Sequence, residues 1–169
     1  MQQTAMLEQT YPILEKLVEN ALQLLSQLHN LLQEESVALV NLKSPETIGA
    51  IAQAKKQLVS QLELFNTHCG QLLATEQLSN NQQGLDEYFQ RAETAGLLTQ
   101  ELTDHWATII ALSQQCRTLN EQNGTSIAIL SRHNERLLQI LKGKPDTAHT
   151  YGPDGSKRSE LYTRTLISV

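Results

Sequence analysis

The chain has 169 residues, of which 40% are hydrophobic, and this length is enough for one domain with a hydrophobic core. Only 4% of the residues are aromatic, and Leu and Gln are frequent, which favours elongated helices over compact sheets. The net charge is −5 and no basic stripe runs along the sequence, so the charge pattern is not that of a protein that binds nucleic acid or anionic membranes. We therefore expect the partners to be proteins.

The cysteines and the first residues indicate the compartment. Cys69 and Cys116 are single thiols in helical pattern, and residues 1–9 have neither a basic start nor an apolar run. No segment reaches the roughly 20 consecutive apolar residues that a transmembrane helix needs. We expect a cytoplasmic protein without stable membrane insertion.

A heptad pattern predicts a first long helix over about residues 3–42. Its apolar seam comprises Leu7, Tyr11, Leu14, Val18, Ala21, Leu25, Leu28, Leu32, Leu39 and Leu42, together with Glu35. Leu17, Leu24, Leu31 and Ala38 widen the seam on one side, so this helix can contact more than one neighbour, as helices in bundles do.

Three start signals predict a second helix over about residues 45–78. Ser44 is a helix cap, Pro45 suits the first turn, and Glu46 is an early acidic residue. After so tight a turn the two helices should pack antiparallel. The second seam comprises Ile48, Ile51, Lys55, Leu58, Leu62, Phe65, Cys69 and Leu72.

Each of the two seams contains one charged residue. Glu35 and Lys55 lie at about equal distances from the turn near Ser44, so we predict that they meet across the hairpin. Such a polar layer would fix the register and add little stability, because two charges are partly desolvated. The alternative is that both side chains reach out to water.

Residues 79–84, Ser-Asn-Asn-Gln-Gln-Gly, predict a surface loop, and a short helix over about 84–94 should follow. A third long helix is expected over about 97–142. Its stripe comprises Leu98, Leu102, Ile109, Leu112, Cys116, Leu119, Leu130, Leu137 and Leu141. Asn123-Gly124 interrupts the stripe, which resumes in phase at Ile127, so we expect the helix to bend or loosen there.

The end of this third helix is apolar on more than one face. One stripe contains Ile127, Leu130, Leu137, Leu138 and Leu141. Ile129 and Ile140 lie roughly a third of a turn away, beside Arg132 and Arg136. Because one stripe suffices for an internal core, the second patch is either a further intramolecular contact or a docking surface for another protein.

The sequence gives little support for catalysis. The five histidines are scattered, the two cysteines lack zinc-ligand spacing, and no cofactor or metal site is expected. His133 lies in a segment similar to the phosphoacceptor helix of two-component phosphorelays, so a histidine phosphotransfer bundle is a remote alternative. Trp106 fits a core anchor better than a binding hot spot.

Several short motifs occur together near the end of the chain. They are Leu119-Asn120-x-x-Asn123-Gly124, the later Asn134, Tyr151-Gly152-x-x-Gly155, and a terminal Ile167-Ser168. In this order, behind two heptad helices, they resemble flagellar export chaperones of the FlgN type. The resemblance implies a cytoplasmic chaperone that binds flagellar hook–filament junction proteins, prevents their premature assembly, and delivers them to the flagellar type III export gate.

The resemblance also implies functional residues. The family block near the client matches Leu119, Asn120, Asn123, Gly124, Asn134, Leu138 and Leu141. The apolar pattern adds Ile127, Ile129, Leu130, Leu137 and Ile140 to this client-binding set. Export-gate docking is implied for Tyr151, Gly152 and Gly155.

The predicted fold is all-α: a long antiparallel hairpin and a third long helix form a chaperone domain over residues 1–142, followed by a flexible tail over 143–169. The alternative from another class is a structural coiled-coil adaptor or oligomerisation module, in which the wide face of the first helix packs against a second copy. The preferred junction protein, the stoichiometry and the oligomeric state are left open.

Overall fold

The computed structural model describes residues 2–142, with side chains from Ala5 onward. It contains helices α1 (Gln2–Val40), α2 (Pro45–Thr75), α3 (Gln82–Thr94) and α4 (Gln100–Leu141), and no strand among the described residues. The prediction of an all-α fold with a helical hairpin and a further long helix is confirmed. The predicted tail residues Tyr151, Gly152 and Gly155 lie outside the described range.

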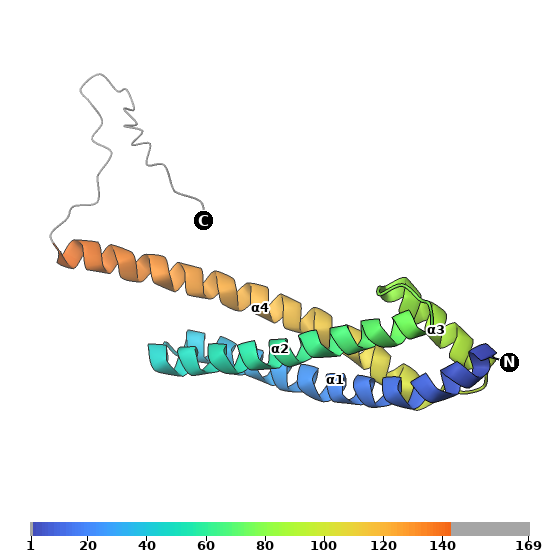
Figure 1. Cartoon of the computed structure of the whole chain (residues 1–169). Helices are drawn as coiled ribbons and strands as arrows, with labels where there is room; N and C mark the ends of the chain where they lie inside the picture. The colour runs from blue at the N-terminus through green and yellow to red at the C-terminus, as the bar shows by residue number, and fades with distance from the viewer. Residues whose placement is uncertain (1, 143–169) are drawn as a thin grey trace, which may run out of the picture. The chain divides into compact units, whose positions relative to one another are not determined.

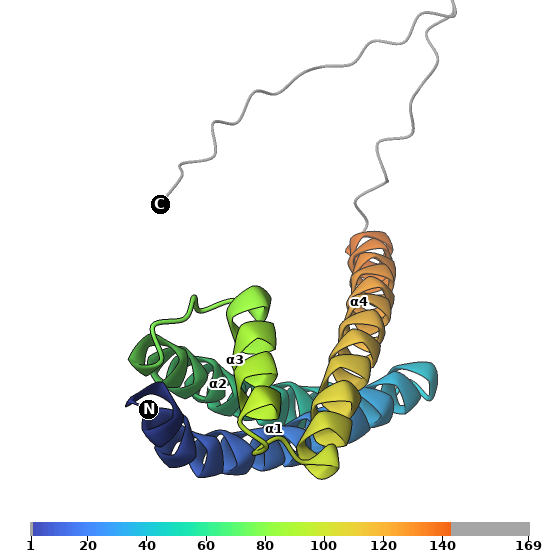
Figure 2. The same ribbon diagram turned by 90° about the vertical axis from the view of Figure 1, so that its right-hand side faces the viewer.

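The chain forms two units, one that ends at Ile127 and one that begins at Ala128, so α4 belongs to both. In the first unit α1 and α2 lie side by side and antiparallel (Figure 1). Figure 2 shows α2, α3 and the first part of α4 arranged around α1. Helix α1 is therefore the central element on which this unit is built.

The turn between α1 and α2 follows its predicted chemistry. The backbone N–H of Thr47 donates to Ser44 Oγ at 3.4 Å, and Pro45 is the first helical residue. The first seam was predicted to reach Leu42, which is wrong, because α1 ends at Val40. Leu42 adopts a left-handed conformation with φ of 49° and is largely exposed.

The heptad seams form the core of the first unit. All predicted seam residues of α1 up to Leu39 are buried, including Glu35. In α2 the seam is half-buried from Ile48 to Phe65 and buried at Cys69 and Leu72. The wider face of α1 is also used within this chain, since Leu24 and Ala38 are buried.

The predicted loop over residues 79–84 is shorter in the structure. Helix α3 begins at Gln82, and the side chain of Asn81 caps it by accepting a hydrogen bond from Gly84 N at 2.8 Å. Gly84 is buried, and a Cβ at this position would lie 1.9 Å from the carbonyl oxygen of Ser79. The glycine thus permits a close backbone approach instead of forming part of a loop.

A polar cluster ties α3 to the hairpin. Thr10 Oγ1 donates to Glu76 Oε1 at 2.6 Å and lies 2.9 Å from the hydroxyl oxygen of Tyr88. Tyr88 is fully buried, and this burial raises its pKa to about 12. The sequence analysis did not identify this cluster, because its three members come from α1, from the end of α2 and from α3.

The first part of α4 lies along α1. The thiol of Cys116 donates to the carbonyl oxygen of Leu25 at 3.9 Å, and Asn123 Nδ2 donates to that of Leu32 at 2.9 Å. The α-helix is continuous through Asn123-Gly124, so the predicted loosening does not occur. Asn123 is instead buried against α1.

The two cysteines and the tryptophan are structural. Cys69 and Cys116 are free and buried, as predicted, and burial raises the pKa of both thiols. Trp106 is half-buried and meets Phe89 edge to face, with ring centroids 6.0 Å apart. This contact supports the interpretation of Trp106 as a core anchor.

Candidate functional site

The end of α4 carries a set of exposed apolar side chains, which we call the distal segment (Ile127–Leu141). The exposed fractions are 41% for Ile127, 49% for Ile129, 58% for Leu137, 52% for Leu138, 70% for Ile140 and 81% for Leu141. Soluble helices usually direct such side chains into a core. A run of exposed apolar residues on one helix is typical of a surface that binds another protein.

The exposed side chains occupy two faces of the helix. At about a hundred degrees per residue, Leu137, Leu138 and Leu141 share one face, while Ile129 and Ile140 share another. The sequence analysis expected the first face to continue the core stripe, but Leu137 and Leu141 are exposed. Both faces are therefore accessible, and the distal segment can offer apolar surface over much of its circumference.

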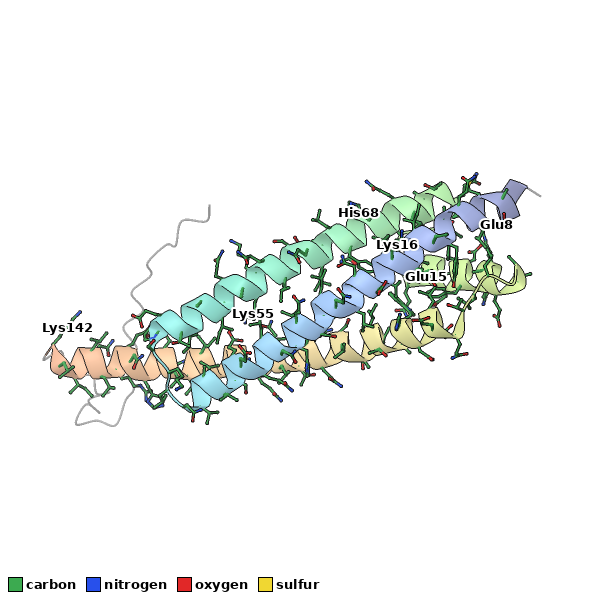
Figure 3. All side chains as sticks on the ribbon, turned by 90° about the horizontal axis from the view of Figure 1, so that it is seen from below. Glu8, Glu15, Lys16, Lys55, His68 and Lys142 are labelled. Atoms are coloured by element: carbon green, nitrogen blue, oxygen red, sulfur yellow. The ribbon has the colours of Figure 1, made fainter. Side chains whose placement is uncertain are left out.

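The charged residues of the distal segment and its end are mainly basic. Arg132, Arg136 and Lys142 are exposed, and Glu135 is the acidic residue among them (Figure 3 labels Lys142). The whole chain has a net charge of −5, so this part differs in sign from the protein as a whole. A partner segment with apolar side chains and acidic neighbours would complement it.

The remaining predicted client-binding residues are not all accessible. Leu119 and Leu130 are half-buried, and Asn120, Gly124 and Asn134 are exposed. Asn123 is only 2% exposed, and its amide bonds to α1. The structure thus places most predicted residues on the surface but gives Asn123 an internal position.

Other kinds of site find little support. His133 is exposed, as is every side chain from Ser131 to Lys142, so its exposure does not distinguish it. Within residues 5–142 no group of three or more side chains could hold a metal ion. No helix in the described part is long and apolar enough to cross a bilayer.

Two surface hollows lie in the first unit. One of about 470 Å³ is lined by residues that include Leu7, Glu76 and Arg91, and one of about 460 Å³ by residues that include His29 and Gln114. In the first hollow Arg91 already donates to Glu87 and to the carbonyl oxygen of Glu76. The distal segment remains the stronger candidate, because its apolar side chains are exposed.

Comparison with known proteins identifies a family. The family model described as FlgN protein matches residues 6–159, which include almost all of the four helices. No curated protein and no solved structure matches the chain. The family match therefore covers both the first unit and the distal segment.

Proposed function

Because this chain belongs to the FlgN family, whose members are flagellar export chaperones and are not known as enzymes, we propose that it binds flagellar hook–filament junction proteins in the cytoplasm. It holds them until export, prevents their premature assembly, and delivers them to the flagellar type III export gate. The observation that carries the client-binding part is the exposure of apolar side chains on two faces of the distal segment.

The physical basis is helix-to-helix docking. An amphipathic helix of a junction protein packs its apolar face on Ile129 and Ile140 and on the adjacent face at Leu137 and Leu141. The apolar surface buried on both partners drives association, and the basic side chains beside it favour a client with acidic neighbours. The same contact hides a client segment that would otherwise assemble early.

The test exchanges two apolar side chains for charges. Ile129→Asp with Ile140→Asp should abolish client capture, because two carboxylates would be desolvated in the docked state. Helicity and melting temperature should stay close to wild type, since both side chains are exposed. Co-purification with each junction protein and circular dichroism measure the two effects.

A matched control carries the same two charges on another face. Ala128→Asp with Gln139→Asp keeps the spacing of eleven residues but turns the carboxylates by about a hundred degrees, and both positions are exposed. This control should still capture the client. If it loses the client equally, added charge and not the apolar face explains the result. If the first pair unfolds the protein, Ile129 and Ile140 are core residues.

The proposed delivery of clients to the export gate is tested by removing the tail, residues 144–169. The full chain and a version ending at Gly143 are each incubated with the junction proteins and with the cytoplasmic part of the export gate. Both forms should capture the client, and gate binding should need residues 144–169. Tyr151→Ala in the full chain should weaken gate binding and leave client capture unchanged. An unchanged gate affinity would remove Tyr151 from this function.

The adaptor alternative rested on the wide apolar face of α1 being free to contact a second copy. It required the wide face of α1 to pack against a second copy, but Leu24 and Ala38 on that face are buried within one chain. Light scattering with and without client provides a direct test. An adaptor would form a fixed homo-oligomer that the client does not change, whereas a chaperone should show a mass increase that corresponds to bound client.

A further inference from the structure

A buried polar layer connects the three long helices in the first unit. Glu35 of α1 is 1% exposed, and its Oε2 accepts a hydrogen bond from Lys55 Nζ at 2.7 Å and from Asn123 Nδ2 at 2.9 Å. Figure 3 shows Lys55 on the part of α2 that lies beside α1. The predicted meeting of Glu35 and Lys55 is thus confirmed, but α4 contributes a third member that was not expected.

Asn123 is held at both of its amide hydrogens. One N–H donates to Glu35 and the other to the carbonyl oxygen of Leu32, each at 2.9 Å. The two acceptors are three residues apart, so they lie on the same side of α1. Because the asparagine side chain is short, only one position of α4 along α1 satisfies both bonds.

Asn120 lies one turn before Asn123 and faces the same layer. Its Oδ1 accepts a long hydrogen bond from Lys55 Nζ at 3.5 Å. The amides of Asn120 and Asn123 are therefore both directed to side chains or backbone of this chain. These are two of the residues that the sequence analysis assigned to client binding.

The bond between Asn123 and Leu32 lies one heptad after the contact between Cys116 and Leu25. Cys116 with Leu25 and Asn123 with Leu32 are both separated by 91 residues, so α1 and α4 run parallel with a constant offset. A slip of α4 by one heptad would move it by about 10 Å. Glu35 would then face Cys116 or Leu130, and Asn123 would lose the carboxylate of Glu35 as an acceptor.

Such a slip would leave polar groups buried without partners. The carboxylate of Glu35 would keep only Lys55, and in a slip toward the start of α1 the Asn123 amide would meet the apolar seam residue Leu28 in place of Glu35. Unpaired buried amides and partly paired carboxylates are strongly disfavoured. The apolar stripes alone do not penalise the slip in this way, since they repeat at the same spacing.

We propose that the Glu35–Lys55–Asn123 layer fixes the register of α4 on α1, and that the side chains of Asn120 and Asn123 serve this internal positioning instead of contacting the client. The layer is a specificity device: apolar replacements of similar volume would keep or raise the stability of the bundle while removing the preference for one register. Its link to chaperone activity rests on the proposed function, because α4 also carries the distal segment.

The experiment measures register in the full chain without any client. Spin labels are placed at Asn20→Cys and Thr118→Cys, which are both exposed, in a background with Cys69→Ala and Cys116→Ala. Because each residue of α1 lies opposite the residue of α4 that is 91 positions later, Asn20 lies opposite position 111, which is one heptad before Thr118. A slip would change the axial part of their separation from about 10 Å to about 0 or 20 Å, and double electron–electron resonance would detect the resulting shift in the distance between the labels.

The variants replace the layer in two ways. Glu35→Leu, Lys55→Leu and Asn123→Leu together should keep or raise the urea midpoint but give a second distance population, which corresponds to an axial displacement of about 10 Å. Asn123→Leu alone keeps the Glu35–Lys55 pair and should also populate the second distance, so it serves if the triple variant does not fold. Glu35→Gln is the matched control, because its amide oxygen still accepts from Asn123, and it should retain one distance.

One outcome overturns the inference: a single unshifted distance in both leucine variants would mean that apolar packing alone sets the register. Client capture is measured separately on the same proteins. If wild type captures no client, the proposed function fails and the distance result still stands. If the slipped variants lose register but capture client as wild type does, register has no part in client binding, which overturns the link between the two.

Discussion

Helix α4 contains two regions with the same apolar periodicity and opposite surroundings. In the first region the stripe residues Leu102, Ile109 and Cys116 are buried, with exposed fractions of 1%, 5% and 6%, and Leu112 and Leu119 are half-buried. In the distal segment the stripe residues Leu137 and Leu141 are 58% and 81% exposed. One sequence pattern therefore lies in two different surroundings.

The difference shows what helical periodicity encodes. A heptad repeat determines which side of a helix is apolar, but it contains no information on where the opposing surface is. For Cys116 the opposing surface is α1 of the same chain, as its contact with Leu25 shows. For the distal segment we propose that the opposing surface belongs to a client.

The largest expected contrast is in the free energy of unfolding. Leu102→Ala should lower it by about 3 kcal/mol, because it removes buried methyl groups and leaves a cavity. Leu137→Ala should change it by less than about 0.5 kcal/mol, because the side chain is exposed and Ala is a good helix former. Urea unfolding followed by circular dichroism gives both values.

An equal loss in the free energy of unfolding for Leu102→Ala and Leu137→Ala would contradict the difference between the two regions of α4. It would show that Leu137 is buried in solution, against a second copy or against another part of the chain. Repeating the Leu137→Ala measurement over a wide range of protein concentration separates these cases, since only burial between copies makes stability depend on concentration.

The second contrast is in how the free energy of unfolding depends on pH, which we expect to be set by a buried group of the first unit. Burial raises the pKa of Tyr88 to about 12, against about 10 for an unperturbed tyrosine. The unfolded chain thus loses this proton first, so the stabilisation is complete below pH 10 and is lost as the pH rises to 12. The free energy of unfolding should fall by about 2 kcal/mol over this window.

Tyr88→Phe separates this effect from other alkaline titrations. The variant should be less stable at neutral pH by about 1 kcal/mol, because Thr10 loses its partner at 2.9 Å. It should also show a weaker decrease in stability between pH 10 and 12 than wild type. Parallel pH profiles for the two proteins would contradict the burial argument, because other groups would then cause the loss.

Periodicity and turn chemistry were sufficient to predict much of the fold. The α1 seam from Leu7 to Leu39 and the cap at Ser44 follow from local sequence, and the meeting of Glu35 with Lys55 follows from their equal distances to a tight turn. These features depend on residues that are close in sequence or related by one hairpin.

Features that depend on distant residues were missed. Tyr88 lies in a helix of 13 residues, and its partner Thr10 is 78 residues away, so the periodicity of the helix gives no information on this contact. The helix was predicted to bend or loosen at Asn123-Gly124, but it is continuous there, and the amide of Asn123 donates to the carbonyl oxygen of Leu32, 91 residues away. In the site, the pattern identified both apolar faces of the distal segment but not which of them is exposed.

The smallest expected effect concerns an exposed leucine outside the distal segment. Leu42 follows α1 with φ of 49°, and its neighbour Lys43 N donates to the carbonyl oxygen of Ala38 at 3.0 Å, a helix-ending pattern that favours glycine. Leu42→Gly should therefore raise the free energy of unfolding by about 0.5 kcal/mol, since relief of the left-handed strain exceeds the added chain entropy.

Two glycine exchanges bracket this prediction. Gln77 follows the C-cap of α2 with φ of 60°, so Gln77→Gly should stabilise similarly. Gly96→Ala should destabilise by about 1 kcal/mol, because Gly96 has φ of 71°; a Cβ there would meet no other atom, so the effect comes from the backbone conformation alone. Leu42→Gly should leave client capture unchanged, because turn geometry explains its exposure. If stability rises but client capture falls, Leu42 belongs to the binding surface, and the contrast between the distal segment and the first unit would no longer locate the client.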